Sequence, residues 1–275
     1  MKNLVEEFSK HLKEGLEIGA KTEFRNTSKS FDNIFICGLG GSGIGGKLIS
    51  QLYYDKINQP ITVSNDYFIP KSVGSNTLTI ACSYSGNTEE TLSATQLAYE
   101  KGAKVVVISS GGKLKELANE HGWDHIEIPG GQPPRASFGL SFPEVLYALY
   151  GNGVISDSFE KELKASIKLL DENETSIQEE AKAVTEKLFG KIPVIYAADG
   201  FGGVATRFRQ QINENSKMLC WHHVIPEMNH NELVGWRTKN DDLAVVLFRN
   251  ETDFKNMRAP MNINTAPFAE YSFST

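Results

Sequence analysis

Two stretches decide the fold class of this chain: IFICGLGGSGIGG, residues 34–46, and LTIACSYSGNTEET, residues 78–91. In each, an apolar run rich in β-branched residues predicts a buried parallel strand, and the run ends in small residues before a helical pattern begins. Open α/β sheets bind ligands at such strand ends. Glycine allows close main-chain approach, helix N-termini present free N–H groups, and hydroxyl groups add donors. A phosphate monoester fits this set, for which the candidates are Gly40, Gly41, Ser42, Ser83, Ser85 and Thr88.

Strand and helix patterns alternate through the first half of the chain. Alternation of this kind predicts a doubly wound parallel sheet with helices on both faces. The strands are expected at 34–37, 61–64, 78–82, 105–109 and 125–128, and the helices at 45–54, 89–101 and 113–121. An amphipathic helix is expected at the N-terminus, before the first strand.

The second half predicts a related but shorter unit. A helical pattern at 157–188 precedes a strand at 193–198, the glycine turn DGFGG and a helix from about Val204, an order that repeats the first junction without its serines. The 27 residues after Phe248 have few periodic apolar positions and do not suffice to complete a matching domain. We therefore expect an N-terminal domain over 1–152 and a C-terminal domain over 153–275, truncated or divergent after about residue 250.

Composition narrows the class of protein. A net charge of −6 disfavours a broad nucleic-acid surface, so no nucleic-acid partner is expected. Three cysteines without framework spacing predict reduced thiols and a cytoplasmic location. The apolar runs are too short to span a bilayer, so no membrane partner is expected either.

The first junction also fits a dinucleotide fingerprint, with Gly38, Gly40 and Gly43 followed by Asp66 after the second strand. An NAD-dependent enzyme is therefore an alternative. The hydroxyl-rich second stretch argues for a terminal phosphate instead, because a pyrophosphate needs mainly glycine main chain. Taken alone, that stretch is also consistent with an ordinary serine-rich turn that caps a helix.

Candidate acid–base groups lie in a later segment. Glu214 stands between two asparagines where the helix from Val204 is expected to end, and His230 stands in a polar loop that also holds Glu232. A carboxylate and an imidazole at one site suit proton transfer. No metal site is expected, because Gly122 breaks the helix that would align His121 with His125.

Together these motifs resemble the bifunctional phosphoglucose/phosphomannose isomerases, a family built from two sugar-isomerase (SIS) domains. The resemblance rests on GLGGSG, SYSGNTEET, PPRASFG, NENSK and MNHNELVGW and covers most of the chain to about Asn250. It implies a 6-phosphate site at Ser83, Ser85 and Thr88, with Gly40, Gly41 and Ser42 nearby. It also implies a homodimer, no redox cofactor and no metal.

The resemblance assigns catalytic roles as well. Glu214 would be the base, His230 would assist ring opening, and Arg135, in the irregular segment 129–142, would stabilise the enediolate. One carboxylate can move the proton between C2 and C1 of a planar cis-enediol. A nearby guanidinium lowers the barrier as negative charge develops on the oxygen.

One departure concerns the C-terminus. The family carries a lysine near the sugar ring there, and Lys255 stands too early to be its counterpart. We therefore expect this chain to bind sugar phosphates and to isomerise them more slowly than a full-length relative. A phosphosugar-binding SIS protein without turnover is the other open alternative.

Overall fold

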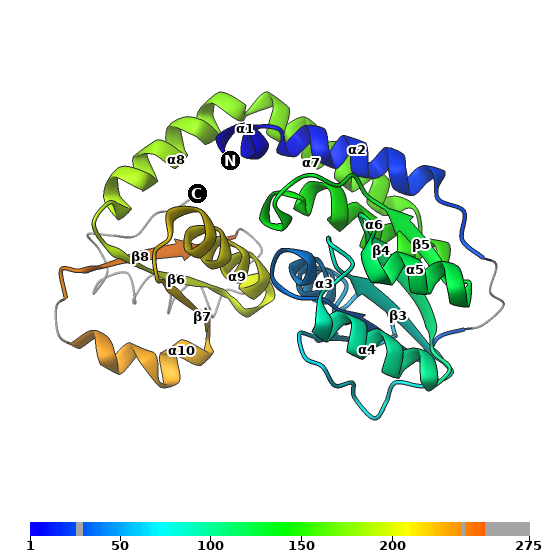
Figure 1. The fold of residues 1–275 in the computed structure, drawn as a ribbon. Helices are drawn as coiled ribbons and strands as arrows, with labels where there is room; N and C mark the ends of the chain where they lie inside the picture. The colour runs from blue at the N-terminus through cyan, green and yellow to red at the C-terminus, as the bar shows by residue number, and fades with distance from the viewer. Residues whose placement is uncertain (26–29, 238–239, 251–275) are drawn as a thin grey trace. The chain divides into compact units, whose positions relative to one another are not determined.

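The computed structural model describes residues 1–25, 30–237 and 240–250 and divides the chain into two compact units, Met1–Glu172 and Asn173–Thr275 (Figure 1). The boundary lies about 20 residues after the expected one. The reason is α7 (Ser158–Glu172), which buries Phe159 and Leu163 in the core of unit 1. The segment after Asn250, including Lys255, lies outside the described residues.

Unit 1 contains a parallel sheet in the order β2-β1-β3-β4-β5. β2 and β3 lie on opposite sides of β1, so the strand order reverses beside β1. In open α/β sheets, such a reversal opens a ligand crevice at the carboxyl ends of the strands. The strands are β1 (Asn33–Cys37), β2 (Ile61–Ser64), β3 (Thr77–Cys82), β4 (Lys104–Ser109) and β5 (Asp124–Glu127).

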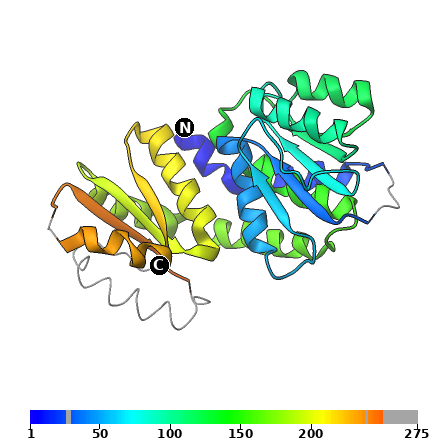
Figure 2. The same cartoon turned by 90° about the horizontal axis from the view of Figure 1, so that it is seen from below.

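Helices cover both faces of this sheet (Figure 1, Figure 2). One apolar core joins the sheet to α2, α3 and α6, and a second joins its other face to α4 and α5. These helices are α2 (Phe8–Lys21), α3 (Gly40–Leu52), α4 (Glu89–Glu100), α5 (Gly112–His121) and α6 (Phe138–Gly151), with α1 (Lys2–Glu6) ahead of them. The doubly wound prediction is confirmed.

Three helix boundaries differ from expectation. α3 starts at Gly40 rather than at residue 45, and α6 starts at Phe138, inside the segment expected to be irregular. The long helical pattern is divided at Asn173 between α7 and α8 (Glu174–Leu188). Glycine and proline weaken a local helix signal, while packing against neighbouring elements stabilises the helix in the fold.

The described residues of unit 2 form a parallel sheet in the order β7-β6-β8. Its strands are β6 (Ile192–Ala198), β7 (Trp221–Ile225) and β8 (Leu243–Phe248), of which β7 was not expected from the sequence. α9 (Gly202–Gln211) packs on one face, and α10 (Glu227–His230) with the 3₁₀ helix Glu232–Arg237 packs on the other. Histidine and tryptophan interrupt the aliphatic pattern of β7, and its place in the sheet is decided by pairing with β6.

Candidate active site

Main-chain contacts explain the glycines of the first junction, where β1 meets α3. A Cβ at Gly38 would lie 2.5 Å from the carbonyl oxygen of Cys82, and a Cβ at Gly43 would overlap the carbonyl oxygen of Gly38. Gly40 has a φ of +51°, in the left-handed region that glycine adopts at little cost. Gly38 therefore lies directly against the end of β3, and the first turn of α3 packs on Gly38.

The serine loop, residues 83–88, comes after β3 and gathers hydroxyl groups at this edge. Ser83 is buried, and its Oγ lies 2.9 Å from Oγ1 of Thr88. The N–H of Tyr84 donates to Ser42 Oγ over 3.0 Å, which ties the loop to the first junction. Thr88 directly precedes α4, so the free N–H groups of that helix begin where the loop ends. The exposed Ser85 accepts a hydrogen bond from the N–H of Asn87 over 3.2 Å.

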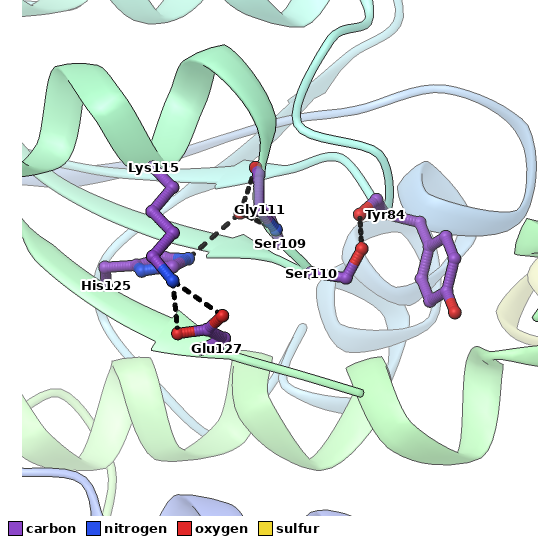
Figure 3. Close-up of polar contacts among 7 residues, drawn as sticks. All are labelled: Tyr84, Ser109, Ser110, Gly111, Lys115, His125 and Glu127. Atoms are coloured by element: carbon purple, nitrogen blue, oxygen red, sulfur yellow. Dashed lines mark hydrogen bonds and ion pairs between the residues drawn. The ribbon is translucent and has the colours of Figure 1, made fainter. Parts of the chain in front are cut away.

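A support loop, residues 109–112, underlies the serine loop. Ser110 donates to the carbonyl oxygen of Tyr84 from its N–H over 2.9 Å and from its hydroxyl over 2.7 Å (Figure 3). Just beyond it, the N–H of Lys113 donates to the side-chain oxygen of Asn87 over 2.9 Å. These bonds fix the shape of the serine loop without using its own hydroxyl groups.

Ser109 and His125 form a polar pair behind the support loop (Figure 3). Ser109 Oγ donates to the carbonyl oxygen of Gly111 over 3.0 Å and lies 2.9 Å from Nε2 of His125. Burial lowers the pKa of His125, so the imidazole is neutral near pH 7 and its Nε2–H can donate to the serine. The pair is structural rather than nucleophilic, because Ser109 is fully buried and its proton is already committed to Gly111.

Arg135 lies beside the first junction. It belongs to the arginine segment, residues 129–137, which contains the 3₁₀ turn Pro134–Ala136. A Cβ at Gly41 would lie 2.8 Å from the carbonyl oxygen of Pro134 and 3.3 Å from Cα of Arg135. The absence of a side chain at Gly41 therefore lets the main chain of Arg135 pass directly over the start of α3.

Glu214 lies in a π-helical turn, Ile212–Ser216, at the end of α9. Lys217 comes next with a φ of +58°, uncommon for a residue with a side chain, and its Nζ donates to the carbonyl oxygen of Glu214 over 2.6 Å. Asn213 donates to the carbonyl oxygen of Met218 over 2.7 Å. Uncommon backbone held by side-chain bonds is frequent at functional sites, and here it surrounds the candidate base.

Arg207 was not expected to contribute. Burial lowers the pKa of its guanidinium, and the charge of Glu214 acts in the opposite direction, so the two groups lie near enough to interact electrostatically. The signal was present in the sequence, because residues seven apart on a helix share a face.

His230 and Glu232 have different surroundings. His230 ends the short helix α10, is exposed, and is carried by a turn that the buried Met228 anchors. Glu232 accepts hydrogen bonds on both oxygens: Oε1 from the hydroxyl of Tyr196 over 2.6 Å and from the indole of Trp221 over 3.2 Å, and Oε2 from His223 over 2.7 Å. Glu232 therefore fastens the MNHNELVGW segment to the sheet, which makes it a poorer candidate base than Glu214.

The structure brings one set of candidates together at the carboxyl edge of the unit 1 sheet. The first junction contacts the serine loop at Ser42 and the arginine segment at Gly41. The candidates on these three segments are Gly40, Gly41, Ser42, Ser83, Ser85, Thr88 and Arg135. The other two candidates, Glu214 and His230, belong to unit 2.

An apolar groove of about 890 Å³ lies within unit 2. Side chains of α8, α9 and β8 line it, including Val184, Phe208 and Phe248, and among the described residues no lysine or arginine does. A sugar phosphate needs donors and positive charge, so this groove is not the candidate site.

The described ranges contain no group of three or more His, Cys, Asp or Glu side chains that could hold a metal ion. In the same ranges, no helix has both the length and the apolar character needed to cross a membrane.

The relationship to known proteins is close. A bifunctional phosphoglucose/phosphomannose isomerase of Caldicellulosiruptor bescii is 41% identical over 271 residues, which span 95% of this chain and 79% of that protein. The chain belongs to the bifunctional phosphoglucose/phosphomannose isomerase family. A second such isomerase, from Aquifex aeolicus, is 38% identical over 237 residues, which span 85% of this chain and 72% of that protein.

Two further matches concern the domains. The model of the bacterial phospho-glucose isomerase C-terminal SIS domain matches residues 177–273. This match includes the residues after Arg249 as far as residue 273. The C-terminal domain of glucosamine-fructose-6-phosphate aminotransferase from Francisella tularensis has the same fold, with a TM-score of 0.73 over 97% of this chain and 80% of that one at 15% identity. The SIS fold is thereby confirmed.

Proposed function

We propose that this isomerase interconverts glucose 6-phosphate and mannose 6-phosphate with fructose 6-phosphate. The observation that carries the proposal is the gathering of Ser42, Ser83, Thr88 and Arg135 at one edge of a sheet, in a chain 41% identical to a phosphoglucose/phosphomannose isomerase. Hydroxyl donors and helix N–H groups suit a phosphate dianion. A guanidinium suits the negative charge that develops on the enediolate oxygen.

The serine loop binds the phosphate in this proposal. Ser83, Ser85 and Thr88 donate to its oxygens, and Gly40, Gly41 and Ser42 complete the site from the first junction. The support loop and Lys113 leave these hydroxyl groups available, because they bond to the main chain of Tyr84 and to the side chain of Asn87. The phosphate thereby anchors the end of the sugar remote from the reacting carbons.

Proton transfer is assigned to unit 2. Glu214 removes the proton from C2 and returns it to C1 through a cis-enediol, while His230 donates to the ring oxygen as the sugar opens. Arg135 stabilises the oxyanion of the enediolate. Electrostatic attraction to Arg207 supports the placement of the Glu214 carboxylate. Neither a redox cofactor nor a metal takes part in these steps.

We propose further that the protein is a homodimer in the cytoplasm. The β8 edge of unit 2 pairs with no second strand among the described residues, and an open edge favours association. Three unpaired cysteines suit a reducing compartment.

The test measures both turnover and exchange. The chain is incubated with glucose 6-phosphate or mannose 6-phosphate, fructose 6-phosphate is followed with a coupled assay, and loss of the C2 proton to D₂O is followed by NMR. We expect product and exchange with both aldoses. Binding without either signal would favour a phosphosugar-binding protein instead, and tight binding of NADH in a fluorescence titration would favour the dinucleotide alternative.

A further inference from the structure

Tyr84 connects four segments at the carboxyl edge of the unit 1 sheet. Its main chain belongs to the serine loop, donates to Ser42 of the first junction, and accepts from Ser110 of the support loop. Figure 3 shows the contact with Ser110, with the ring of Tyr84 extending to the opposite side. Tyr84 is 7% exposed and belongs to the apolar core of unit 1, so packing restricts the position of its ring.

The hydroxyl of Tyr84 bonds to the arginine segment. It donates to the carbonyl oxygen of Pro129 over 3.0 Å and accepts from the N–H of Gln132 over 2.9 Å. One hydroxyl therefore holds two main-chain groups, three residues apart, in a stretch that has no strand or helix of its own. The side chain of Gln132 reaches His11 of α2 over 3.2 Å, which fastens the segment on its far side.

We propose that Tyr84 is a positioning residue that sets Arg135 relative to the phosphate bound by the serine loop. The inference rests on the proposed function for the roles of both groups. Tyr84 joins them through one rigid aromatic side chain with few rotatable bonds: its main chain lies between Ser83 and Ser85, and its hydroxyl holds the segment that leads into Arg135. A guanidinium that must meet an oxyanion within hydrogen-bond distance is sensitive to shifts of about 1 Å, which can cost about a hundredfold in rate.

The expected effect falls on kcat rather than on KM. Tyr84→Phe keeps the ring and every main-chain bond of the serine loop and removes only the two bonds to the arginine segment. We expect kcat for glucose 6-phosphate to fall about tenfold or more while KM changes less than about threefold. The matched control is Tyr147→Phe, which removes a buried tyrosine hydroxyl bonded to Glu160 over 3.0 Å in the same unit and should leave both constants unchanged.

A double-mutant cycle with Arg135→Ala separates positioning from a general loss of structure. If Tyr84 acts through Arg135, Tyr84→Phe should lower kcat little further once the guanidinium is absent. If instead the losses in kcat multiply, Tyr84 does not act through Arg135 and the proposal is overturned.

A binding experiment decides the proposal without turnover. Arabinonate 5-phosphate, whose carboxylate imitates the enediolate, and inorganic phosphate are titrated by calorimetry into wild type and Tyr84→Phe. We expect the variant to bind the aldonate about tenfold more weakly and inorganic phosphate equally well. Equal losses for the two ligands, or no loss for either, would overturn the positioning role. A wild-type chain that binds both ligands but does not isomerise would overturn the proposed function alone.

Discussion

The two units arrange their strands in the same order but differ in the turns at the strand ends. The order β7-β6-β8 in unit 2 repeats β2-β1-β3 in unit 1, with β6 in the central place of β1. β1 in unit 1 and β6 in unit 2 each lead through a glycine-containing turn into a helix that packs on the sheet. Topology alone therefore does not distinguish the unit proposed to bind phosphate from the unit proposed to move protons.

The residues of the two turns do distinguish them. Unit 1 has Gly38 directly after its strand, where the main chain approaches Cys82, whereas unit 2 has Asp199, whose carboxylate would repel an anion. The sixth residue after the strand is Gly43 in unit 1 and Val204 in unit 2. The two units therefore differ in the residues placed at the strand end rather than in the fold that presents them.

The largest expected effect is on the rate of proton transfer, which is assigned to unit 2. Glu214→Gln should lower the rate of C2 proton exchange for glucose 6-phosphate by about 10²–10⁴, because an amide cannot serve as a general base. Affinity for fructose 6-phosphate should stay within about threefold, because the serine loop is intact. Exchange is measured by NMR in D₂O and affinity by calorimetry.

Glu232→Gln is the matched control for that variant. The amide can still accept from Tyr196 and Trp221, so a smaller loss of exchange is expected. If Glu232→Gln rather than Glu214→Gln abolished exchange, the assignment of the base would be wrong.

The second prediction compares how a methyl group in the turn after β1 and one in the turn after β6 change the free energy of unfolding. Gly43→Ala should destabilise the protein by about 2–4 kcal/mol, because the new methyl group overlaps main chain that cannot move aside. Gly200→Ala, in the unit 2 turn, meets no atom within 4 Å and should change the free energy of unfolding by less than about 1 kcal/mol. Urea unfolding measures both. Equal losses would show that the two turns are packed alike.

The third prediction concerns affinity in unit 1. Ser83→Ala combined with Thr88→Ala should weaken fructose 6-phosphate binding by at least about tenfold, because each hydrogen bond to a charged group contributes roughly 1.5–3 kcal/mol. A control pair, Ser166→Ala with Ser176→Ala, removes exposed hydroxyl groups that bond to helix carbonyl oxygens. Calorimetry should find wild-type affinity in the control, and the same affinity in the loop variant would remove the phosphate assignment.

The smallest effect concerns the core of unit 1. Glu144 of α6 is 0% exposed, its carboxyl oxygens have no hydrogen-bond partner in the described residues, and burial raises its pKa to about 9. Because the folded carboxyl keeps its proton to higher pH than the unfolded one, stability falls as the pH rises from about 4.5 toward 9.

Glu144→Gln should therefore increase the free energy of unfolding by about 1–2 kcal/mol at pH 8 and change it little at pH 4.5, where the carboxyl is largely neutral in the folded state. The control is Glu116→Gln, an exposed carboxylate paired only at the surface with Lys113. Urea unfolding across this pH range measures the difference. A gain at pH 4.5 as large as the gain at pH 8 would show that Glu144 is not held neutral by the fold.

The sequence predicted the elements whose signals are local. The strand expected at 61–64 matches β2, and the α/β class was predicted from alternating patterns. The sequence also predicted that the first junction and the serine loop lie at one edge of the sheet, because consecutive residues at the ends of parallel strands are presented at the same edge.

Only the tertiary structure decided the remaining features, because they depend on residues far apart in the chain. In the sequence, Tyr84 is one aromatic residue within SYSGNT, and its bonds to Pro129 and Gln132 exist only when four segments meet. The engagement of Glu232 by Tyr196 likewise joins residues 36 apart, and β7 is a strand because β6 pairs with it. Residue type and local pattern determine which groups reach an edge of a sheet, whereas burial and pairing determine which of them are held in place and which are left to react.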